Sequence, residues 1–340
     1  MGTLMATEAL AAASAVAAQR TVADERIAAL AQLLARRQPK LALTVARGSS
    51  DHAANYFAYL AMRRLGVPVV SLPMSLVTLH RAPLAVAGQF ALAVSQSGES
   101  PDLIETMAAL RDGGAITAAL VNRVESPLAR RCEWVLPLCA GDERSVAATK
   151  SYIATLAAIA RLVGHWQGDV GLLRSIESLP DRLEAGSRVD ASQLLDALLG
   201  AERAMVVGRG LGFAVALEAA LKLKEICSIQ AEAFSSAEVR HGPMALIDDG
   251  YPLLVFALRG PEQAGLIEFA REMRVRGARV ILAAPADVAD ADVTFAVADD
   301  EVLDPIVAIQ SFYLVVAKLA EARGLDADAP RHLSKVTRTH

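Results

Sequence analysis

Short apolar runs alternate with longer helical patterns along the first half of the chain. The runs at residues 41–46, 67–72, 90–94, 115–121 and 132–138 are predicted to be strands. Several segments between them, of about 10 to 15 residues, carry apolar side chains at helical spacing, and Gly66 ends one of them as a C-cap glycine does. Strands that alternate with helices predict a parallel sheet flanked by helices on both faces, and hence an α/β fold.

The second half of the chain repeats this plan. Residues 204–210 match residues 44–48, and each stretch leads into an alanine-rich helical pattern. Residues 253–258 likewise correspond to the apolar run at 90–94. Repetition of this kind predicts two related domains in tandem. The predicted order is N-terminal helices at residues 1–40, a first domain at 41–174, a polar linker at 175–192, a second domain at 193–325 and a C-terminal tail at 326–340.

The charge balance and hydropathy exclude several partners. A formal net charge of −4 leaves no surplus of basic residues for binding nucleic acid or an anionic membrane. No uninterrupted run of about 18 apolar residues exists, so we predict no transmembrane helix. The alanine-rich start at residues 10–18 follows Glu8 rather than basic residues, which indicates an amphipathic helix and not a signal peptide.

Cysteine usage indicates a reducing compartment. Cys132, Cys139 and Cys227 are too few and too widely spaced for a disulfide framework, and they form no paired metal-ligand motif. We therefore expect a cytoplasmic protein without a metal site.

Residues 95–100 place three serines, a glutamine and a glycine between an apolar strand and a helical pattern. Free backbone N–H groups and the positive end of a helix dipole meet at such a junction, which favours an anion. For any single serine, a helix cap is the simpler interpretation. Three hydroxyls and a glycine in six residues favour a phosphate site, which we call the cradle. Residues 48–50 end another strand and are expected at the same edge of the sheet.

A glycine-rich stretch in the second half has a competing interpretation. Residues 208–212 (Gly-Arg-Gly-Leu-Gly) follow a strand and open a helix, as a dinucleotide-binding loop does. Compared with the dinucleotide-binding motif, the third glycine stands one position early, and no acidic residue ends a strand at the usual distance after it. We therefore do not expect a dinucleotide cofactor. Residues 259–261 (Arg-Gly-Pro) stand where the first half has its serines, so only the first half is predicted to hold a phosphate.

The densest polar segment runs from Lys222 to His241. Lys222 and Glu225 are three residues apart and share one helix face beside apolar neighbours. A partly buried carboxylate can carry a proton, and histidine is a common acid or base near neutrality. On spacing alone, a surface salt bridge is the simpler explanation for Glu225. A structural hydrogen bond for His241 and a solvated tail for Lys335 are likewise the simpler explanations.

Five motifs in the same order as in a known family carry a resemblance. They are Ser95-Gln96-Ser97-Gly98-Glu99-Ser100, residues 145–150 (Ser-Val-Ala-Ala-Thr-Lys), residues 221–225 (Leu-Lys-Leu-Lys-Glu), residues 240–243 (Arg-His-Gly-Pro) and residues 333–337 (Leu-Ser-Lys-Val-Thr). Together they resemble the sugar isomerase (SIS) family, specifically the isomerase half of glutamine:fructose-6-phosphate amidotransferase and its stand-alone relatives. The resemblance covers nearly the whole chain and implies two tandem SIS domains.

This resemblance also implies a phosphosugar substrate and a set of binding residues. The residues that would hold the phosphate and nearby hydroxyls are Ser50, Ser95, Gln96, Ser97 and Ser100. Val146 and Ala148 would line the sugar, although the amidotransferase has a serine at the place of Ala148.

The implied catalytic residues lie outside the cradle. Glu225 would move a proton between C1 and C2 of the opened sugar, and Lys222 would support it. His241 would catalyse ring opening from a neighbouring subunit, which implies a homodimer with a shared active site. Lys335 would close over the sugar and could form a Schiff base with a ketose carbonyl.

One absence narrows the expected reaction. The amidotransferase has a glutaminase cysteine just after the initiator methionine, whereas position 2 here is Gly2, so no glutaminase domain is expected. The stand-alone relatives with these motif versions resemble glucosamine-6-phosphate deaminases, which convert glucosamine 6-phosphate to fructose 6-phosphate and ammonia. A phosphosugar isomerase without nitrogen chemistry and a non-catalytic sugar-phosphate-binding regulatory module remain the alternatives. None of the three requires a cofactor.

Overall fold

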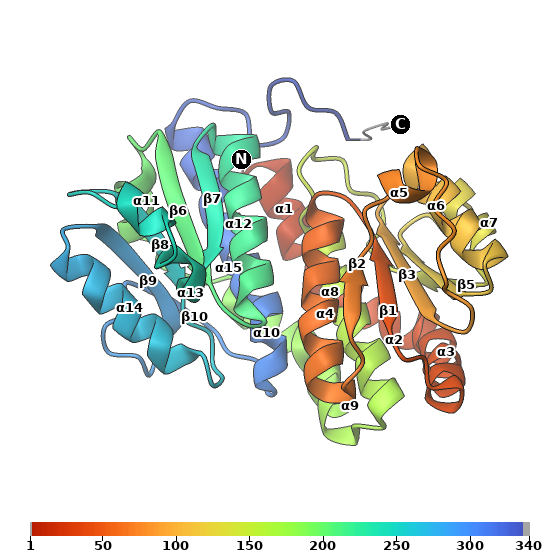
Figure 1. Cartoon of the computed structure of the whole chain (residues 1–340). Helices are drawn as coiled ribbons and strands as arrows, with labels where there is room; N and C mark the ends of the chain where they lie inside the picture. Colours follow the sequence, from red (N-terminus) through yellow and green to blue (C-terminus); the bar gives the residue numbers. More distant parts are fainter. Residues whose placement is uncertain (1, 336–340) are drawn as a thin grey trace. The chain divides into compact units, whose positions relative to one another are not determined.

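A computed structural model describes residues 2–335 of the chain (Figure 1). Its contacts divide the chain into two compact units. The first-sheet unit consists of Ser14–Glu143, Lys150–Glu177 and the residues from Ser334 onward. The second-sheet unit consists of the residues up to Ala13, Arg144–Thr149 and Ser178–Leu333.

The first-sheet unit is built on five parallel strands in the order β2-β1-β3-β4-β5. The strands are β1 (Ala42–Val45), β2 (Val69–Ser71), β3 (Phe90–Ser95), β4 (Ile116–Val121) and β5 (Trp134–Pro137). The three central strands, β1, β3 and β4, are buried almost throughout, as expected for a sheet covered on both faces. The predicted parallel α/β architecture is therefore confirmed.

Helices flank both faces of this sheet. They are α2 (Ala12–Val22), α3 (Asp24–Arg37), α4 (Ser49–Leu65), α5 (Ser75–Thr78), α6 (Pro101–Asp112), α7 (Pro127–Arg131), α8 (Lys150–Gln167) and α9 (Val170–Glu177). Gly66 ends α4 in the left-handed conformation, with φ of 66°, as its C-cap position predicts. Helix α8 is buried from Lys150 to Gly164 because α3 and α4 both pack against it.

The second-sheet unit has the same topology. Its five parallel strands run in the order β7-β6-β8-β9-β10, so each strand takes the place of its counterpart in the first sheet. The strands are β6 (Arg203–Gly208), β7 (Gln230–Ser235), β8 (Pro252–Phe256), β9 (Arg279–Pro285) and β10 (Val293–Phe295). The predicted internal repeat is thus confirmed as two related sheets.

Strand β7 was absent from the sequence prediction. It lies at the edge of its sheet, and its burial alternates at first, with Gln230 and Glu232 exposed and Ala231 buried. Polar side chains on the exposed face of an edge strand hide the apolar run that identifies a buried strand.

The helices of this unit include two that are buried over much of their length. They are α1 (Leu4–Leu10), α10 (Leu179–Gly186), α11 (Ser192–Leu198), α12 (Gly212–Cys227), α13 (Ser236–Val239), the 3₁₀ turns η1 (Pro243–Leu246) and η2 (Glu301–Leu303), α14 (Gln263–Val275) and α15 (Asp304–Ala322). The two buried helices are α12 and α15, which pack against each other (Figure 1).

Helix α15 and the turn before it are long and apolar enough to cross a membrane, by length and composition alone. The segment Glu301–Ala322 has a mean hydropathy of 1.6, but 89% of its apolar window is buried inside the protein. This burial is what a core helix shows, so the segment is weak support for a membrane span.

Much of the predicted polar linker at residues 175–192 is helical, as α10, and the two compact units divide within it, between Glu177 and Ser178. Leu179 and Leu183 are four residues apart, fully buried, and place α10 against α15. Because charged and small residues surround these two leucines in the sequence, the apolar pattern of a helix is difficult to recognise there. Residues 336–340 of the predicted tail lie outside the described residues.

Replacing Gly208 with alanine is expected to destabilise the second-sheet unit. A Cβ on Gly208 would lie 2.4 Å from the backbone oxygen of Gly212, where β6 meets the first turn of α12. Backbone cannot move aside cheaply, so we expect a loss of about 1–3 kcal/mol in the free energy of unfolding, measured with urea.

Gly265→Ala is the matched control for this substitution. It lies exposed in α14 with open space around the added methyl, and should raise stability by about 0.5–1 kcal/mol. Equal effects of the two substitutions would contradict the proposed packing.

Candidate active site

The cradle residues lie where the strand order of the first sheet changes direction. Strands β1 and β3 are neighbours, and helices α4 and α6 begin close after their carboxyl ends. Ser50 lies in the first turn of α4, and residues 95–100 connect the end of β3 to α6. In open α/β sheets, ligands bind at this position.

Two cradle serines offer hydrogen-bond donors. Ser95 and Ser97 are 7% and 8% exposed. The Oγ atom of Ser95 accepts from the N–H of Gly98 at 3.0 Å, and the Oγ atom of Ser97 accepts from the N–H of Glu99 at 3.3 Å. Within residues 2–335 neither hydroxyl donates to an acceptor. Their O–H groups are therefore available to a ligand that only accepts hydrogen bonds, such as a phosphate.

Position 98 requires a glycine both because of its backbone conformation and because a neighbouring side chain lies close to it. Its φ is +64°, and an added Cβ would lie 2.2 Å from the Oγ atom of Ser126, the residue that caps α7. The structure shows that contact with the start of α7 already demands a glycine.

An ion pair that the sequence interpretation missed joins the two helix starts. Arg47, at the end of β1, donates from Nε and Nη2 to one carboxylate oxygen of Asp102, at 3.1 and 2.9 Å. Asp102 is the second residue of α6 and is almost fully buried. The two residues are 55 positions apart, so no local pattern in the sequence indicates the pair.

Lys222 and Glu225, two of the residues predicted to be catalytic, belong to a largely buried polar network on α12 of the second-sheet unit. The ammonium of Lys222 contacts Glu225 Oε2 at 2.5 Å and Glu218 Oε1 at 3.2 Å, and the hydroxyl of Tyr313 donates to Glu218 at 2.9 Å. The side chains of Lys222 and Glu218 are 0% exposed, whereas that of Glu225 is 23% exposed. The predicted contact of Lys222 and Glu225 is confirmed.

Lys222 is held in its charged form. Burial alone would lower the pKa of its ammonium, but Glu218 and Glu225 outweigh burial and raise that pKa above its ordinary value. A surface salt bridge is therefore the wrong description of this pair. Glu218, which the sequence analysis missed, stands four residues before Lys222, a spacing that could have identified it.

His241 lies exposed in the turn after α13. Its backbone N–H donates to the carbonyl of Glu238 at 2.9 Å. In the described part of the chain its ring makes no hydrogen bond or ion pair with Lys222 or Glu225. The imidazole is thus accessible from outside the subunit.

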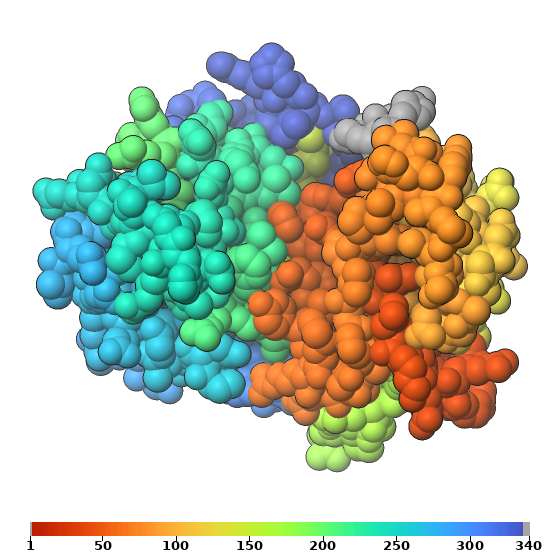
Figure 2. Space-filling view, in the orientation of Figure 1, coloured from red at the N-terminus to blue at the C-terminus, as the bar shows by residue number. Residues whose placement is uncertain are grey.

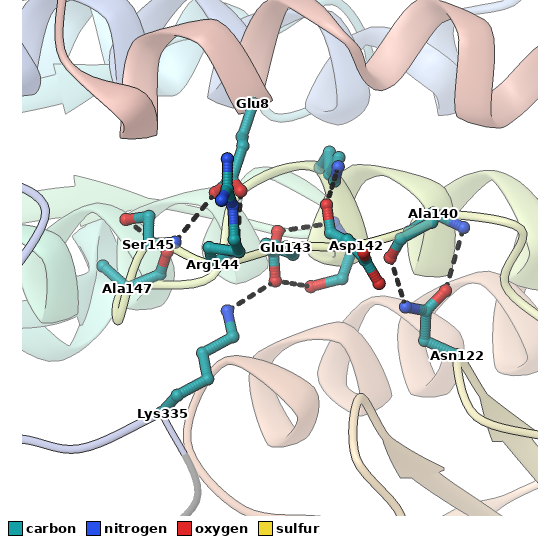
Figure 3. Close-up of polar contacts among 12 residues, drawn as sticks. Glu8, Asn122, Ala140, Asp142, Glu143, Arg144, Ser145, Ala147 and Lys335 are labelled. Carbon is teal, nitrogen blue, oxygen red and sulfur yellow. Dashed lines mark hydrogen bonds and ion pairs between the residues drawn. The ribbon is translucent and has the colours of Figure 1, made fainter.

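Lys335 binds a buried carboxylate in the first-sheet unit (Figure 3). Its ammonium lies 2.8 Å from Glu143 Oε2, and Glu143 also accepts from the backbone N–H and the hydroxyl of Ser151, at 3.0 and 2.7 Å. Burial alone would raise the pKa of Glu143, but Lys335 and Ser151 outweigh it and lower the pKa below its ordinary value of 4.5. Sequence analysis missed Glu143 as a partner because it is 192 positions from Lys335.

The carboxylate of Glu8 and the backbone carbonyl of Asp328 hold the segment Arg144–Thr149, which carries Val146 and Ala148. Glu8 accepts the N–H groups of Arg144 and Ser145 at 2.6 and 3.2 Å (Figure 3). The N–H of Val146 donates to the carbonyl of Asp328 at 3.1 Å. Val146 and Ala148 are half-buried and alternate with buried residues.

The carboxylate of Asp328, a residue of the C-terminal tail at 326–340, binds the start of α1. It accepts from the N–H groups of Leu4 and Met5 at 2.8 and 2.7 Å. In the space-filling view the blue C-terminal part of the chain lies on the surface (Figure 2), and residues 331–334 are exposed. Helix α1, the tail and the segment with Val146 and Ala148 are therefore linked through backbone hydrogen bonds.

The structure distributes the predicted site residues between the units. Ser50, the serines of residues 95–100 and Lys335 belong to the first-sheet unit. Lys222, Glu225, His241, Val146 and Ala148 belong to the second-sheet unit.

The corresponding edge of the second sheet carries a carboxylate at its glycine-rich loop. A Cβ on Gly210 would lie 2.5 Å from a carboxylate oxygen of Glu262, which precedes α14. A carboxylate at this loop repels the phosphates of a dinucleotide. The arrangement supports the interpretation that the cradle belongs to the first half only.

Comparison with known proteins identifies the family. The model of the SIS domain matches residues 37–163 and 197–287. The chain belongs to the SIS domain family. It is 35% identical over 307 residues to a glutamine–fructose-6-phosphate aminotransferase (isomerizing) from Symbiobacterium thermophilum, covering 86% of this chain and 50% of that protein. The chain thus spans about half the length of the curated relatives it matches.

Solved structures share this fold over nearly the whole chain. A protein from Silicibacter pomeroyi, provisionally assigned as a phosphosugar isomerase, is 37% identical with a TM-score of 0.91, covering 96% of this chain and 100% of that one. A glucosamine-6-phosphate deaminase from Thermotoga maritima has a TM-score of 0.78 over 99% of this chain and 100% of its own. At 20% identity the latter likeness shows the fold alone.

The Lys335–Glu143 pair is expected to make stability depend on pH. Because the pKa of Glu143 is lowered on folding, its stabilising contribution is complete above the ordinary value and is lost as the pH falls through the folded-state pKa. The stability advantage of the wild type over Glu143→Gln should therefore shrink between about pH 6 and pH 3 in urea unfolding.

Glu25→Gln, at an exposed position of α3, provides the control and should follow the wild type closely. A difference between wild type and Glu143→Gln that does not change with pH would contradict the assigned ion pair.

Proposed function

We propose that this protein is an isomerising deaminase that converts glucosamine 6-phosphate and water to fructose 6-phosphate and ammonia. The observation that carries the proposal is the contact between Glu225 and the fully buried, charged Lys222. Lys222 binds Oε2 of Glu225, whereas Oε1 makes no hydrogen bond or ion pair in the described part of the chain. A fixed, partly exposed carboxylate with one available oxygen suits a proton carrier.

The cradle would hold the phosphate end of the substrate. The available O–H donors of Ser95 and Ser97 favour a ligand that only accepts hydrogen bonds. Ser50, Gln96 and Ser100 lie at the same edge of the sheet. Val146 and Ala148 would line the sugar. Family membership and the similarity to proteins that act on fructose 6-phosphate or are assigned to phosphosugars support this substrate class.

Proton transfer by Glu225 would convert the opened amino aldose to a ketose imine. Glu225 would take the proton from C2 and return it at C1, and the ammonium of Lys222 would hold the carboxylate in place. Water would then add to C2 of the imine, and the amine would leave as ammonia.

His241 and Lys335 would serve the steps on either side of this transfer. The exposed ring of His241 is suited to opening the sugar ring in a neighbouring subunit, so we propose a homodimer with a shared active site. Lys335 would leave Glu143 to close over the sugar, and could form a Schiff base with the ketose carbonyl.

The protein is proposed to work in the cytoplasm without a cofactor. All three cysteines are free thiols, and burial raises the pKa of Cys132 and Cys227 to about 12. These thiols are therefore poorly reactive, as suits a reducing compartment.

A phosphosugar isomerase without nitrogen chemistry is the second candidate. The 37% identity to the Silicibacter pomeroyi protein favours it, since that likeness covers the whole of the other chain. The same Glu225 and Lys222 would then act on a neutral hydroxy sugar.

Ammonia release from glucosamine 6-phosphate distinguishes these functions. We expect the wild type to release ammonia and fructose 6-phosphate in equal amounts. Turnover of phosphosugars without ammonia would support the plain isomerase. Tight binding without any turnover would instead support a regulatory module, and either result would overturn the deaminase.

Glu225→Gln is expected to lower kcat at least about 100-fold, because the proton carrier is lost, while binding of the sugar phosphate persists. Activity is measured by ammonia release and binding by calorimetry. Glu268→Gln, exposed on α14, is the control and should retain activity. Full activity in Glu225→Gln would show that another residue moves the proton.

Ser97→Ala is expected to raise KM about 3- to 10-fold with little change in kcat, since a phosphate contact is made equally in the ground state and the transition state. Ser187→Ala, after α10, should leave both constants unchanged. A fall in kcat alone would count against a phosphate contact by Ser97.

A further inference from the structure

The cradle as described so far contains only neutral donors. Serine hydroxyls, the amide of Gln96 and backbone N–H groups surround the end of β3, whereas a sugar phosphate carries a charge of about −1.5 to −2 near neutral pH. A water-exposed anion of this charge gains most from a fixed cation with several donors. Arg47 is a cation beside the cradle loops whose position is fixed by a buried partner, Asp102.

Arg47 belongs to the backbone that forms the cradle. It directly precedes Gly48, which has φ of +54° and stands before the first residue of α4. Its partner Asp102 is the second residue of α6, two positions after Ser100. The ion pair therefore bridges the two loops that carry Ser50 and residues 95–100.

The geometry leaves one side of the guanidinium available. Nε and Nη2 both donate to Oδ2 of Asp102, and in the described part of the chain Nη1 makes no hydrogen bond. The side chain of Arg47 is 58% exposed, whereas that of Asp102 is only 3% exposed. Asp102 Oδ1 in turn accepts the N–H of Leu103 at 2.9 Å, which fixes the carboxylate to its helix.

The pair also resolves an electrostatic conflict. An unpaired carboxylate in the first turn of α6 would repel a phosphate that binds at the same helix start. Arg47 cancels this charge and is itself oriented by it. The remaining N–H groups of the guanidinium can then serve a ligand.

We infer that Arg47 is a phosphate-binding residue of the cradle and that Asp102 is the positioning residue that holds its guanidinium. The inference rests on the proposed function, because it assigns the cradle to a phosphorylated ligand. It adds a fixed positive charge to a site that the serine motif alone would leave neutral.

Binding of inorganic phosphate, measured by calorimetry, tests the inference independently of catalysis. Arg47→Met should raise the Kd for inorganic phosphate about 10- to 100-fold and raise KM for glucosamine 6-phosphate similarly, with kcat within about 3-fold of wild type. Arg47→Lys keeps the charge but loses the fork of donors, so it should recover part of the affinity.

Asp102→Ala should weaken phosphate binding less than Arg47→Met does. Combined with Arg47→Met, it should not weaken binding further, because Asp102 acts through Arg47, and it should recover part of the affinity, because it removes the carboxylate that Arg47→Met leaves without this cation. Tighter binding in Asp102→Ala would show that its carboxylate only repels the phosphate, and would overturn the positioning role.

Arg123→Met is the matched control. Arg123 binds the exposed side of Glu99 at 3.0 Å, beside the cradle, but its partner is not buried. Phosphate binding should stay within about 2-fold of wild type. A large loss of phosphate affinity in Arg123→Met, with no loss in Arg47→Met, would show that Arg123 supplies the positive charge that binds the phosphate. That result would overturn the inference.

The failures of the two proposals are distinguishable. If folded Arg47→Met, checked by its thermal midpoint, binds phosphate as the wild type does, the inference fails while the deaminase proposal stands. If the wild type releases no ammonia but Arg47→Met loses phosphate affinity, the deaminase fails and the inference stands. Should Arg47→Met not fold, an unchanged affinity in Arg47→Lys together with an unchanged affinity in Asp102→Ala overturns the inference.

Discussion

The position of β1 beside β3 is the constraint on which the site depends. From this pair the strand order continues in opposite directions, and right-handed crossovers therefore send the following helices to opposite faces of the sheet. The packing shows this division, since Phe90 contacts Phe57 of α4, whereas Ala91 shares a core with Leu103 of α6. The starts of α4 and α6 consequently meet the same edge of the sheet, which is the place where ligands bind in open α/β sheets.

The second sheet repeats this topology but not its chemistry. Its equivalent edge carries the carboxylate of Glu262 beside Gly210, where the first unit has the serines of residues 95–100. The helix after β6 instead carries Lys222 and Glu225 on a face packed against α15. Under the proposed function, the same fold would provide an anion site in one copy and an acid–base pair in the other, as expected where function depends on side chains and not on topology.

Features that depend on neighbouring residues were predictable, and those that depend on distant pairs were not. The serines of residues 95–100 and the contact of Lys222 with Glu225 follow from strand, turn and helix spacing within a few residues. The ion pairs of Arg47 with Asp102 and of Lys335 with Glu143 join segments that only the tertiary fold brings together. Edge strand β7 and helix α10 were missed for another reason, because polar residues interrupt their apolar patterns.

The buried charges on α12 are more simply explained by chemistry than by stability. Removing an ammonium and a carboxylate from water costs several kcal/mol per ion, and well-packed apolar residues of similar size often stabilise a protein as well or better. The neighbours of Lys222 are alanine and leucine, so a leucine at this position would suit the core. An apolar residue at position 222 could not bind one carboxylate oxygen of Glu225 and leave the other oxygen available at the edge of the core. Placing a charge where the fold does not need it is what a proton-transfer site requires.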